Sequence, residues 1–241
     1  MIYDNQVKAF LQGENFSNGA KFSLHNSYGN VLYRDAFLLQ LVKDKSVLHL
    51  GFVDHLPLID KKIKENSWLH KKLMDVATYC YGIDINQEGI AYLKKKYHYD
   101  NMYVLDVLNE TIPSEILDMK FDYLVIPDVI EHIGDPVVFL SAIRKKFKNN
   151  VGQLVLTTPN AFRLNNFINT FKSIEIINTD HRFWFTPYTL SKISTDAELD
   201  IMDMGYFEHR MLSGRQIARK ILLSKYPAFR DTLILRANLI S

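Results

Sequence analysis

The sequence predicts an α/β protein with a doubly wound, mostly parallel sheet of seven strands flanked by helices. Short apolar runs alternate with segments of helical periodicity along most of the chain. The runs are apolar throughout rather than at every second position, which is typical of strands buried on both faces of a parallel sheet. The composition, 47% hydrophobic and 23% charged residues, is that of a folded globular protein rather than a disordered one.

The predicted elements follow one another in a regular order. A polar and aromatic stretch up to about residue 35 and a helical pattern over 35–44 precede a strand at 46–52. Further strands are expected at 80–85, 101–107, 121–128, 152–160, 198–207 and 231–240. Helical patterns between them cover 57–77, 88–97 and 136–147. This alternation predicts crossover helices between parallel strands.

Charge and cysteine content exclude several classes of protein. The balance of 29 Lys and Arg against 27 Asp and Glu gives a net charge of +2, so we expect no bulk field that holds nucleic acid or an anionic membrane, and any such contact must be local. No apolar run approaches the roughly 20 residues that a transmembrane helix needs. The single cysteine, Cys80, and the absence of an apolar leader predict a cytoplasmic location.

Two later segments break the regular pattern. Residues 161–190 contain seven aromatic residues without a clear period, and such a long segment after a core strand serves either substrate contacts or packing. Residues 210–230 contain six basic residues and no acid. This second segment is either a basic amphipathic helix for an anionic or membrane-borne substrate, or the solvated face of an ordinary helix.

Acidic residues stand at the ends of predicted strands, where open parallel sheets bind their ligands. Gly51 ends the first strand, and Asp84, Asp106 and Asp128 end the next three. A carboxylate after the second strand offers two acceptor oxygens at the spacing of a ribose diol, so Asp84 is a candidate for binding adenosine. Taken singly, Asp84 and Asp106 are equally typical of turns and helix caps. The absence of G-x-G-x-x-G disfavours a dinucleotide cofactor.

Several segments resemble, in this order, the motifs of class I S-adenosylmethionine-dependent methyltransferases. They are VLHLGFVDH, YGIDI, VLDV, FDYLVIPDVIEHIGDPVVFL, LTTPN, HRFWFTPYTL and YPAFRDTLILRA. The resemblance covers about residues 30–241 and implies a Rossmann-like methyltransferase fold with S-adenosylmethionine as cofactor. It also implies a single domain over 1–241, with an N-terminal cap (1–43), a cofactor-binding half (44–160) and a substrate-side half (161–241).

The resemblance implies a set of cofactor-binding residues. Gly51 allows close approach of the methionine moiety, Asp84 holds the ribose, and Asp106 with the N–H of Val107 contacts the adenine. Arg34 is a candidate for the methionine carboxylate. The set is completed by Val53, His55, Ile85 and Asp128. His55 is equally well explained as a histidine of a surface loop.

The segment Asp128-Val-Ile-Glu131-His132 is the densest cluster of reactive side chains. In a helix that starts at Asp128, positions i, i+3 and i+4 share one face and form a metal-ligand set. The alternative is a capping box with Asp128 as N-cap and Glu131 at the third helical position. The segment also resembles the acid-x-x-Glu-His segment of ubiquinone-biosynthesis and small-RNA 2′-O-methyltransferases. His181 matches their later histidine, which implies that Asp128, Glu131, His132 and His181 bind a divalent cation (Mg, Mn, Fe or Zn).

These observations together predict an O-methyltransferase that acts on a hydroxyl of a small molecule or of a sugar or glycan precursor. The predicted catalytic residues are His132, His181 and Asp128. If no metal is bound, His132 or His181 is the expected general base, because each titrates near neutral pH. The alternative is a non-catalytic subunit of the same fold that binds a partner, because the usual glycine-rich turn keeps only Gly51.

Overall fold

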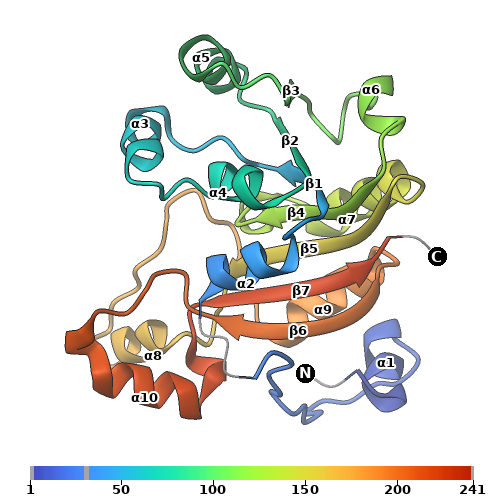
Figure 1. The fold of residues 1–241 in the computed structure, drawn as a ribbon. Coiled ribbons are helices and arrows are strands. Elements are labelled where there is room, and N and C mark those ends of the chain that lie inside the picture. Colours follow the sequence, from blue (N-terminus) through green and yellow to red (C-terminus); the bar gives the residue numbers. More distant parts are fainter. Residues whose placement is uncertain (1–2, 30–32, 240–241) are drawn as a thin grey trace.

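One seven-stranded sheet runs through the molecule in the computed structural model, which describes residues 3–29 and 33–239 (Figure 1). The strand order is β3-β2-β1-β4-β5-β7-β6, and β7 runs antiparallel to both of its neighbours. The predicted fold class is therefore confirmed. Positions 1, 2 and 30–32 of the predicted cap and positions 240 and 241 at the last predicted strand lie outside the described residues.

Each strand overlaps one of the apolar runs in the sequence. The strands are β1 (Ser46–Leu50), β2 (Tyr79–Asp84), β3 (Met102–Val104), β4 (Phe121–Pro127), β5 (Val151–Pro159), β6 (Asp200–Phe207) and β7 (Thr232–Asn238). Parallel pairing joins β1 to β2 and β4, β2 to β3, and β4 to β5. The carboxyl ends of these strands consequently meet at one edge of the sheet.

Helices cover both faces of this sheet, as a doubly wound fold requires. They are α1 (Asn5–Gln12), α2 (Arg34–Leu41), α3 (Leu56–Lys64), α4 (Leu69–Val76), α5 (Gln87–Tyr97), α6 (Ser114–Leu117), α7 (Pro136–Phe147), α8 (Leu164–Thr170), α9 (Pro187–Asp196) and α10 (Ile217–Lys225). Three short 3₁₀ turns are η1 (Ile130–His132), η2 (Gly214–Gln216) and η3 (Pro227–Phe229). Among the described residues, no helix combines the length and hydropathy that a membrane-spanning segment requires.

The helix predicted over 57–77 is divided into α3 and α4. Asn66 has φ +50°, in the left-handed region that asparagine tolerates better than most residues. The N–H of Ser67 donates to the carbonyl of Lys62, which closes the end of α3. The indole N–H of the buried Trp68 then donates to the carbonyl of Phe52 at 3.0 Å. The continuous periodicity was misleading because this tertiary contact turns the chain between two helical segments.

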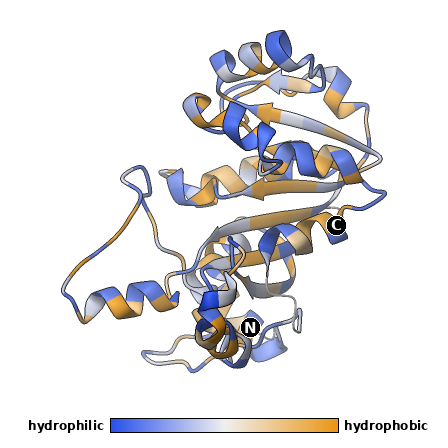
Figure 2. Cartoon of the chain, turned by 60° about the vertical axis from the view of Figure 1, so that its left-hand side comes forward, coloured by the Kyte–Doolittle hydropathy of each residue, from blue (hydrophilic) through white to orange (hydrophobic). Residues whose placement is uncertain are grey.

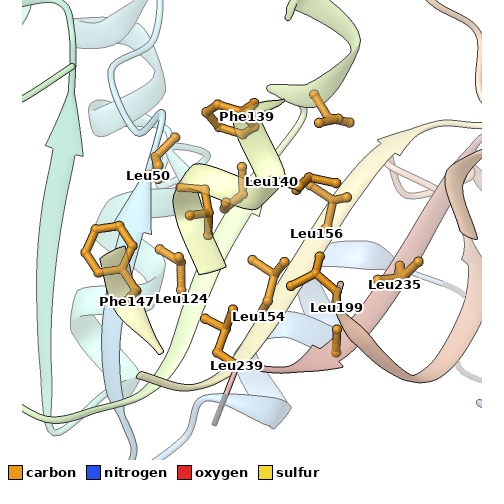
Figure 3. Close-up of a cluster of buried hydrophobic side chains, with 14 of the residues drawn as sticks. Leu50, Leu124, Phe139, Leu140, Phe147, Leu154, Leu156, Leu199, Leu235 and Leu239 are labelled. Atoms are coloured by element: carbon orange, nitrogen blue, oxygen red, sulfur yellow. The ribbon is translucent and has the colours of Figure 1, made fainter. Parts of the chain in front are cut away.

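Side chains on alternate positions of the central strands build the core on opposite faces of the sheet. Leu124 and Leu154 belong to one buried cluster, which Figure 3 shows with leucines and phenylalanines from α7 and neighbouring strands. Val125 and Val155 belong to a second cluster under α2 and α4. Figure 2 shows the matching pattern, with mostly hydrophobic central strands and helices of mixed hydropathy. Burial of each such side chain contributes about 1.5–3 kcal/mol, which fixes the sheet that carries the site.

Candidate functional site

A cavity of about 440 Å³ opens at the carboxyl edge of the sheet, over the ends of β1 and β4. Six residues predicted from the sequence line it: Arg34, Gly51, Val53, His55, Asp128 and His132. Residues that the sequence analysis did not single out also line it, among them His49, Phe52, Trp68, Asn86 and His209. The cavity lies where parallel α/β sheets bind ligands.

Gly51 makes the turn at the end of β1 possible. Its φ is +74°, and a Cβ at this position would lie 2.4 Å from Cγ2 of Val129. Its N–H donates to the carbonyl of Ile83 at 2.9 Å, which ties the turn to β2. Any larger residue would therefore strain the backbone and displace the loop after β4.

The turn has Val53 where a second glycine is common, and the Val53 side chain fits because it packs against Gly89 of α5. A Cβ on Gly89 of α5 would lie 2.4 Å from Cγ1 of Val53, so the small residue stands on the facing helix instead of in the turn. The N–H of Val53 donates to Oδ2 of Asp84 at 2.8 Å. The departure from a glycine-rich turn is thus compensated locally and leaves the cavity open.

Asp84 ends β2 and holds the turn that lines the cavity, although it is not itself a lining residue. Its Oδ2 accepts from the N–H of Val53, and its Oδ1 accepts from the N–H of Asn86 at 2.9 Å. Burial raises the pKa of Asp84 above its usual value, although these backbone hydrogen bonds oppose that shift. Asn86 in turn caps α5 through the N–H of Gly89. The neighbouring Ile85 side chain is exposed.

Asp106 and Val107 lie in the turn after β3 and are absent from the lining of the cavity. Asp106 accepts hydrogen bonds from the N–H of Leu108 and from the N–H and side-chain amide of Asn109. The hydrogen bond from the Asn109 side chain, followed by that from Leu108, lowers the pKa of Asp106. Val107 is buried. The structure therefore gives Asp106 a defined role as a turn residue, which was the alternative explanation for it.

Arg34 and Asp128 meet at the opposite wall. The buried guanidinium of Arg34 forms ion pairs with Asp128 and, at 2.9 Å, with Asp35. The second carboxylate oxygen of Asp128 accepts from Oγ1 of Thr157 at 3.0 Å. Burial alone would raise the pKa of Asp128, but the charges of Arg34 and His209 outweigh it and lower the pKa. Asp128 is thus ionised, and its two carboxylate oxygens contact Arg34 and Thr157.

The predicted helix start at Asp128 and the capping box are both wrong. Asp128 has φ +52°, η1 begins two residues later at Ile130, and its N-cap residue Val129 makes no side-chain cap. The N–H of Asp128 donates to the carbonyl of Thr157, so β4 holds this residue beside β5. The left-handed turn directs Asp128 to Arg34, and it separates this carboxylate from the residues of η1.

Glu131, His132 and His181 come together beside this turn. Their ligand atoms lie within 4.8 Å of one another, and Asp128 is not part of the group. The two imidazole rings are 4.6 Å apart and perpendicular. The N–H of Arg182 donates to the carbonyl of Glu131 at 2.8 Å, which holds the 180–182 segment against η1.

The side chains of this group leave metal-binding atoms unengaged. Oε2 of the fully buried Glu131 accepts from Oγ1 of Thr158 at 3.0 Å, but Oε1 has no hydrogen-bond partner and lies 3.9 Å from Nε2 of His181. Nδ1 of His132 lies 3.2 Å from the carbonyl oxygen of Asp180. Because a carbonyl oxygen only accepts, Nδ1 carries the proton and Nε2 has a free lone pair. One carboxylate and two imidazoles are a donor set that suits a divalent transition ion.

A pair of buried histidines lies under the cavity. Nδ1 of His49 on β1 and Nδ1 of His70 on α4 are 3.1 Å apart. Burial lowers the pKa of His70 to about 3, and burial with the neighbouring His70 and Arg34 lowers that of His49 well below its usual value. Both rings are therefore neutral at physiological pH.

His209 and Asn86 could have been found from the sequence. The rule that identified the acids after β2 and β4 applies equally to β6, which ends at Phe207 and is followed by Glu208 and His209. Nδ1 of His209 lies 3.7 Å from the Asp128 carboxylate. Asn86 stands two residues after the strand-ending acid and starts a helical pattern, which is a helix-cap signature.

Comparison with known families agrees with this architecture. Residues 66–155 match the model of the family described as "Methyltransferase domain". Over these residues the chain is similar to methyltransferase domains, and its fold is that of the class I S-adenosylmethionine-dependent methyltransferases. This match also favours an enzyme over the non-catalytic subunit that the single glycine suggested. A search of curated proteins found no match.

Solved methyltransferases share the fold at low sequence identity. The magnesium protoporphyrin IX methyltransferase of Synechocystis PCC 6803, with bound S-adenosylhomocysteine, is 17% identical with a TM-score of 0.50, over 86% of this chain and 80% of that one. The small RNA methyltransferase HEN1 is 15% identical with a TM-score of 0.55, over 92% of this chain and 27% of that one. A putative methyltransferase of Bacillus halodurans is 12% identical with a TM-score of 0.54, over 86% and 99%. At these identities the similarity shows the fold.

Proposed function

We propose that this methyltransferase transfers the methyl group of S-adenosylmethionine to a hydroxyl oxygen of a small-molecule or saccharide acceptor, assisted by a divalent cation. The observation that carries the proposal is the group of Glu131, His132 and His181 at the rim of the cofactor cavity. His132 belongs to both the group and the cavity lining. An acceptor bound beside His132 therefore lies next to the methyl donor.

The residues around the cavity fit the parts of the donor. We propose that the methionine moiety lies against the turn at Gly51 and that the ribose hydroxyls contact Asp84, whose carboxylate also accepts from the N–H groups of Val53 and Asn86. The buried guanidinium of Arg34, which lines the cavity, is the proposed partner of the methionine carboxylate. Asp106 and Val107 remain predicted adenine contacts.

Methyl transfer to an alcohol breaks the bond between sulfur and the methyl carbon, forms a bond from oxygen to that carbon, and releases the hydroxyl proton. Its main costs are the alignment of donor and acceptor and the removal of this proton. A divalent cation, when bound, lowers the pKa of the hydroxyl and fixes its direction. We assign Glu131, His132 and His181 as its ligands, whereas Asp128 stays paired with Arg34.

The protein supplies the rest of the chemistry through its own side chains. The carbonyl of Asp180 holds His132 in the tautomer whose Nε2 has a lone pair, so this nitrogen accepts the hydroxyl proton when no cation is present. The hydrogen bond from Thr158 fixes the orientation of the Glu131 carboxyl group.

The cytoplasmic location stays a prediction.

The test is a transfer assay with S-adenosylmethionine labelled in its methyl group. The acceptors are catechols, saccharides with vicinal diols, and an RNA oligonucleotide, the last because HEN1, which shares the fold, is a small RNA methyltransferase. A labelled ether that survives alkaline hydrolysis supports transfer to a hydroxyl. Labelled amines or alkali-labile esters instead of ethers contradict the proposal.

A further inference from the structure

Two segments that leave the carboxyl edge of the sheet expose much apolar surface. We call residues 162–177 and 211–226 together the α8/α10 surface. Phe171 is 80% exposed and Met211 81%, while Ile217 and Ile221 on α10 are 63% and 64% exposed. All ten residues from 171 to 180 are exposed. Side chains of this size rarely stay in water over adjoining segments unless they contact a partner.

The two segments form one continuous surface. Figure 1 shows α8 and α10 side by side at one end of the molecule. Nη1 of Arg219 on α10 donates to Oδ1 of Asn165 on α8 at 2.8 Å. Phe167 of α8 also packs near Phe229 of η3, with ring centroids 6.3 Å apart. The exposed apolar residues of both helices are therefore held together rather than dispersed.

Basic side chains accompany the apolar ones. Arg210, Arg215, Lys220 and Lys225 are exposed, and the sequence from 209 to 230 contains no acid. On α10, Ile217 and Ile221 are one turn apart on the exposed side, while Leu223 is buried against the body of the protein. A short helix with an outward apolar row among basic residues is typical of the interface of an anionic membrane.

We propose that the α8/α10 surface docks on an anionic lipid bilayer. The exposed isoleucines and methionine suit acyl chains, and the exposed Phe171 can enter the same apolar layer. A second copy of the same basic surface would be repelled by like charges. In such a contact, Ile217 and Ile221 insert among the acyl chains while the basic side chains stay at the anionic headgroups. The contact therefore uses both the apolar and the basic residues of the surface.

Docking in this manner has a consequence for the candidate site. α8 starts four residues after Asn160, which follows β5, and the chain reaches His181 four residues after this first segment ends at 177. The second segment follows His209, which lines the cavity. Both segments thus connect the bilayer contact to residues of the site, so an acceptor dissolved in the bilayer would reach His132 and His181 from this side. This consequence rests on the proposed function, but the docking itself does not.

Co-sedimentation with vesicles tests the docking without cofactor or acceptor. We expect the full chain to bind vesicles that contain equal parts of phosphatidylcholine and phosphatidylglycerol, to bind pure phosphatidylcholine vesicles far less, and to be released by high salt. The paired variant Ile217→Ser/Ile221→Ser should lower the partition coefficient about tenfold. Lys220→Gln with Lys225→Gln should lower it by a similar factor. Val138→Ser and Lys145→Gln, two exposed positions on α7, are matched controls that should bind normally.

A fluorescent label locates the contact. Cys80 is the only cysteine of the sequence and is buried, so a cysteine introduced by Ile221→Cys is labelled selectively with a polarity-sensitive dye. We expect a blue shift on anionic vesicles for this variant and none for Val138→Cys. Equal binding to both vesicle types, binding to an RNA oligonucleotide but not to vesicles, or a dimer that Ile221→Ser dissociates would each overturn the proposal. If vesicles bind but no methyl transfer is found, only the proposed function fails.

Discussion

Arg34 and Asp128 form an ion pair across the wall of the cavity although 94 positions separate them in the sequence. Arg34 begins α2, and Asp128 occupies a left-handed turn after β4. Both groups stay ionised in this pair, and the remaining carboxylate oxygen of Asp128 accepts from Oγ1 of Thr157. Since Asp128 keeps its negative charge, it adds to the effect of burial in raising the pKa of Glu131 to about 8.

Asp128→Asn should destabilise the fold, because Arg34 would stay buried with Asp35 as its only carboxylate partner. The loss should be about 1.5–3 kcal/mol, the range for hydrogen bonds to charged groups, because Asp128 is partly exposed and Asp35 still compensates Arg34; urea unfolding measures it. The double variant Arg34→Met/Asp128→Asn should recover part of this loss, since it leaves no uncompensated charge. An unfolding free energy equal to that of the parent in Asp128→Asn would show that the pair contributes nothing.

Asp84→Ala should weaken S-adenosylmethionine binding about ten- to hundredfold, the effect of losing charge-assisted hydrogen bonds worth about 1.5–3 kcal/mol. Titration calorimetry measures it. Asp122→Ala is the matched control, because Asp122 likewise accepts from a backbone N–H, that of Ser46, but at the opposite edge of the sheet. It should cost stability and leave affinity unchanged. Equal affinities of Asp84→Ala and the parent would remove the ribose assignment.

Gly51→Ala should cost about 1–3 kcal/mol of stability and also lower the affinity for the cofactor. The new methyl would meet Val129 and the backbone would be held at an unfavourable φ. Gly13→Ala separates these effects, because Gly13 also has a positive φ but nothing within 4 Å of a Cβ. We expect a smaller loss of melting temperature there. Equal losses of melting temperature in the two variants would show that the contact of the new methyl group with Val129 does not affect stability.

His181→Ala should abolish turnover while S-adenosylmethionine still binds, because this residue contacts the acceptor side through the proposed cation. Chelation should have the same effect on the parent, and Mn²⁺ or another divalent ion should restore turnover. Elemental analysis should find metal in the parent and less in the variant. Full activity after exhaustive chelation, with no metal in the protein, would leave the histidines as candidate bases only.

Stability should fall as the pH rises through 7, because burial and then the Asp231 charge raise the pKa of Glu208 from 4.5 to about 7. Above about pH 4.5 the unfolded chain loses the proton that the folded protein keeps. The stabilisation is therefore complete below that pH and is lost as the pH passes 7, by about 3 kcal/mol in total. Chemical unfolding at several pH values should show a steeper loss in the parent than in Glu208→Gln, which keeps only the loss that the raised pKa of Glu131 causes. Parallel profiles would contradict it.

The sequence predicted those parts of the structure that depend on local pattern. Buried strands and α7 follow directly from apolar runs, and the strand-end rule placed Gly51 and Asp84 correctly at the edge of the sheet. The i, i+3, i+4 argument at Asp128 failed because this residue takes a left-handed conformation and pairs with Arg34, a contact between distant segments. Contacts of this kind depend on the assembled sheet, so no local pattern indicates them.

The buried pair of His49 and His70 has an electrostatic consequence for the donor. The sulfonium centre of S-adenosylmethionine carries a fixed positive charge, and a protonated imidazole under the cavity would repel it. Because the pKa values of both rings are far below physiological pH, the floor presents two polarisable but uncharged rings. When the methyl group has been transferred, the sulfonium of the donor has become a neutral thioether. The two uncharged rings therefore neither repel the charged donor nor favour its neutral product by direct charge. In the proposed site, any discrimination between the donor and its demethylated product comes from groups other than these two rings.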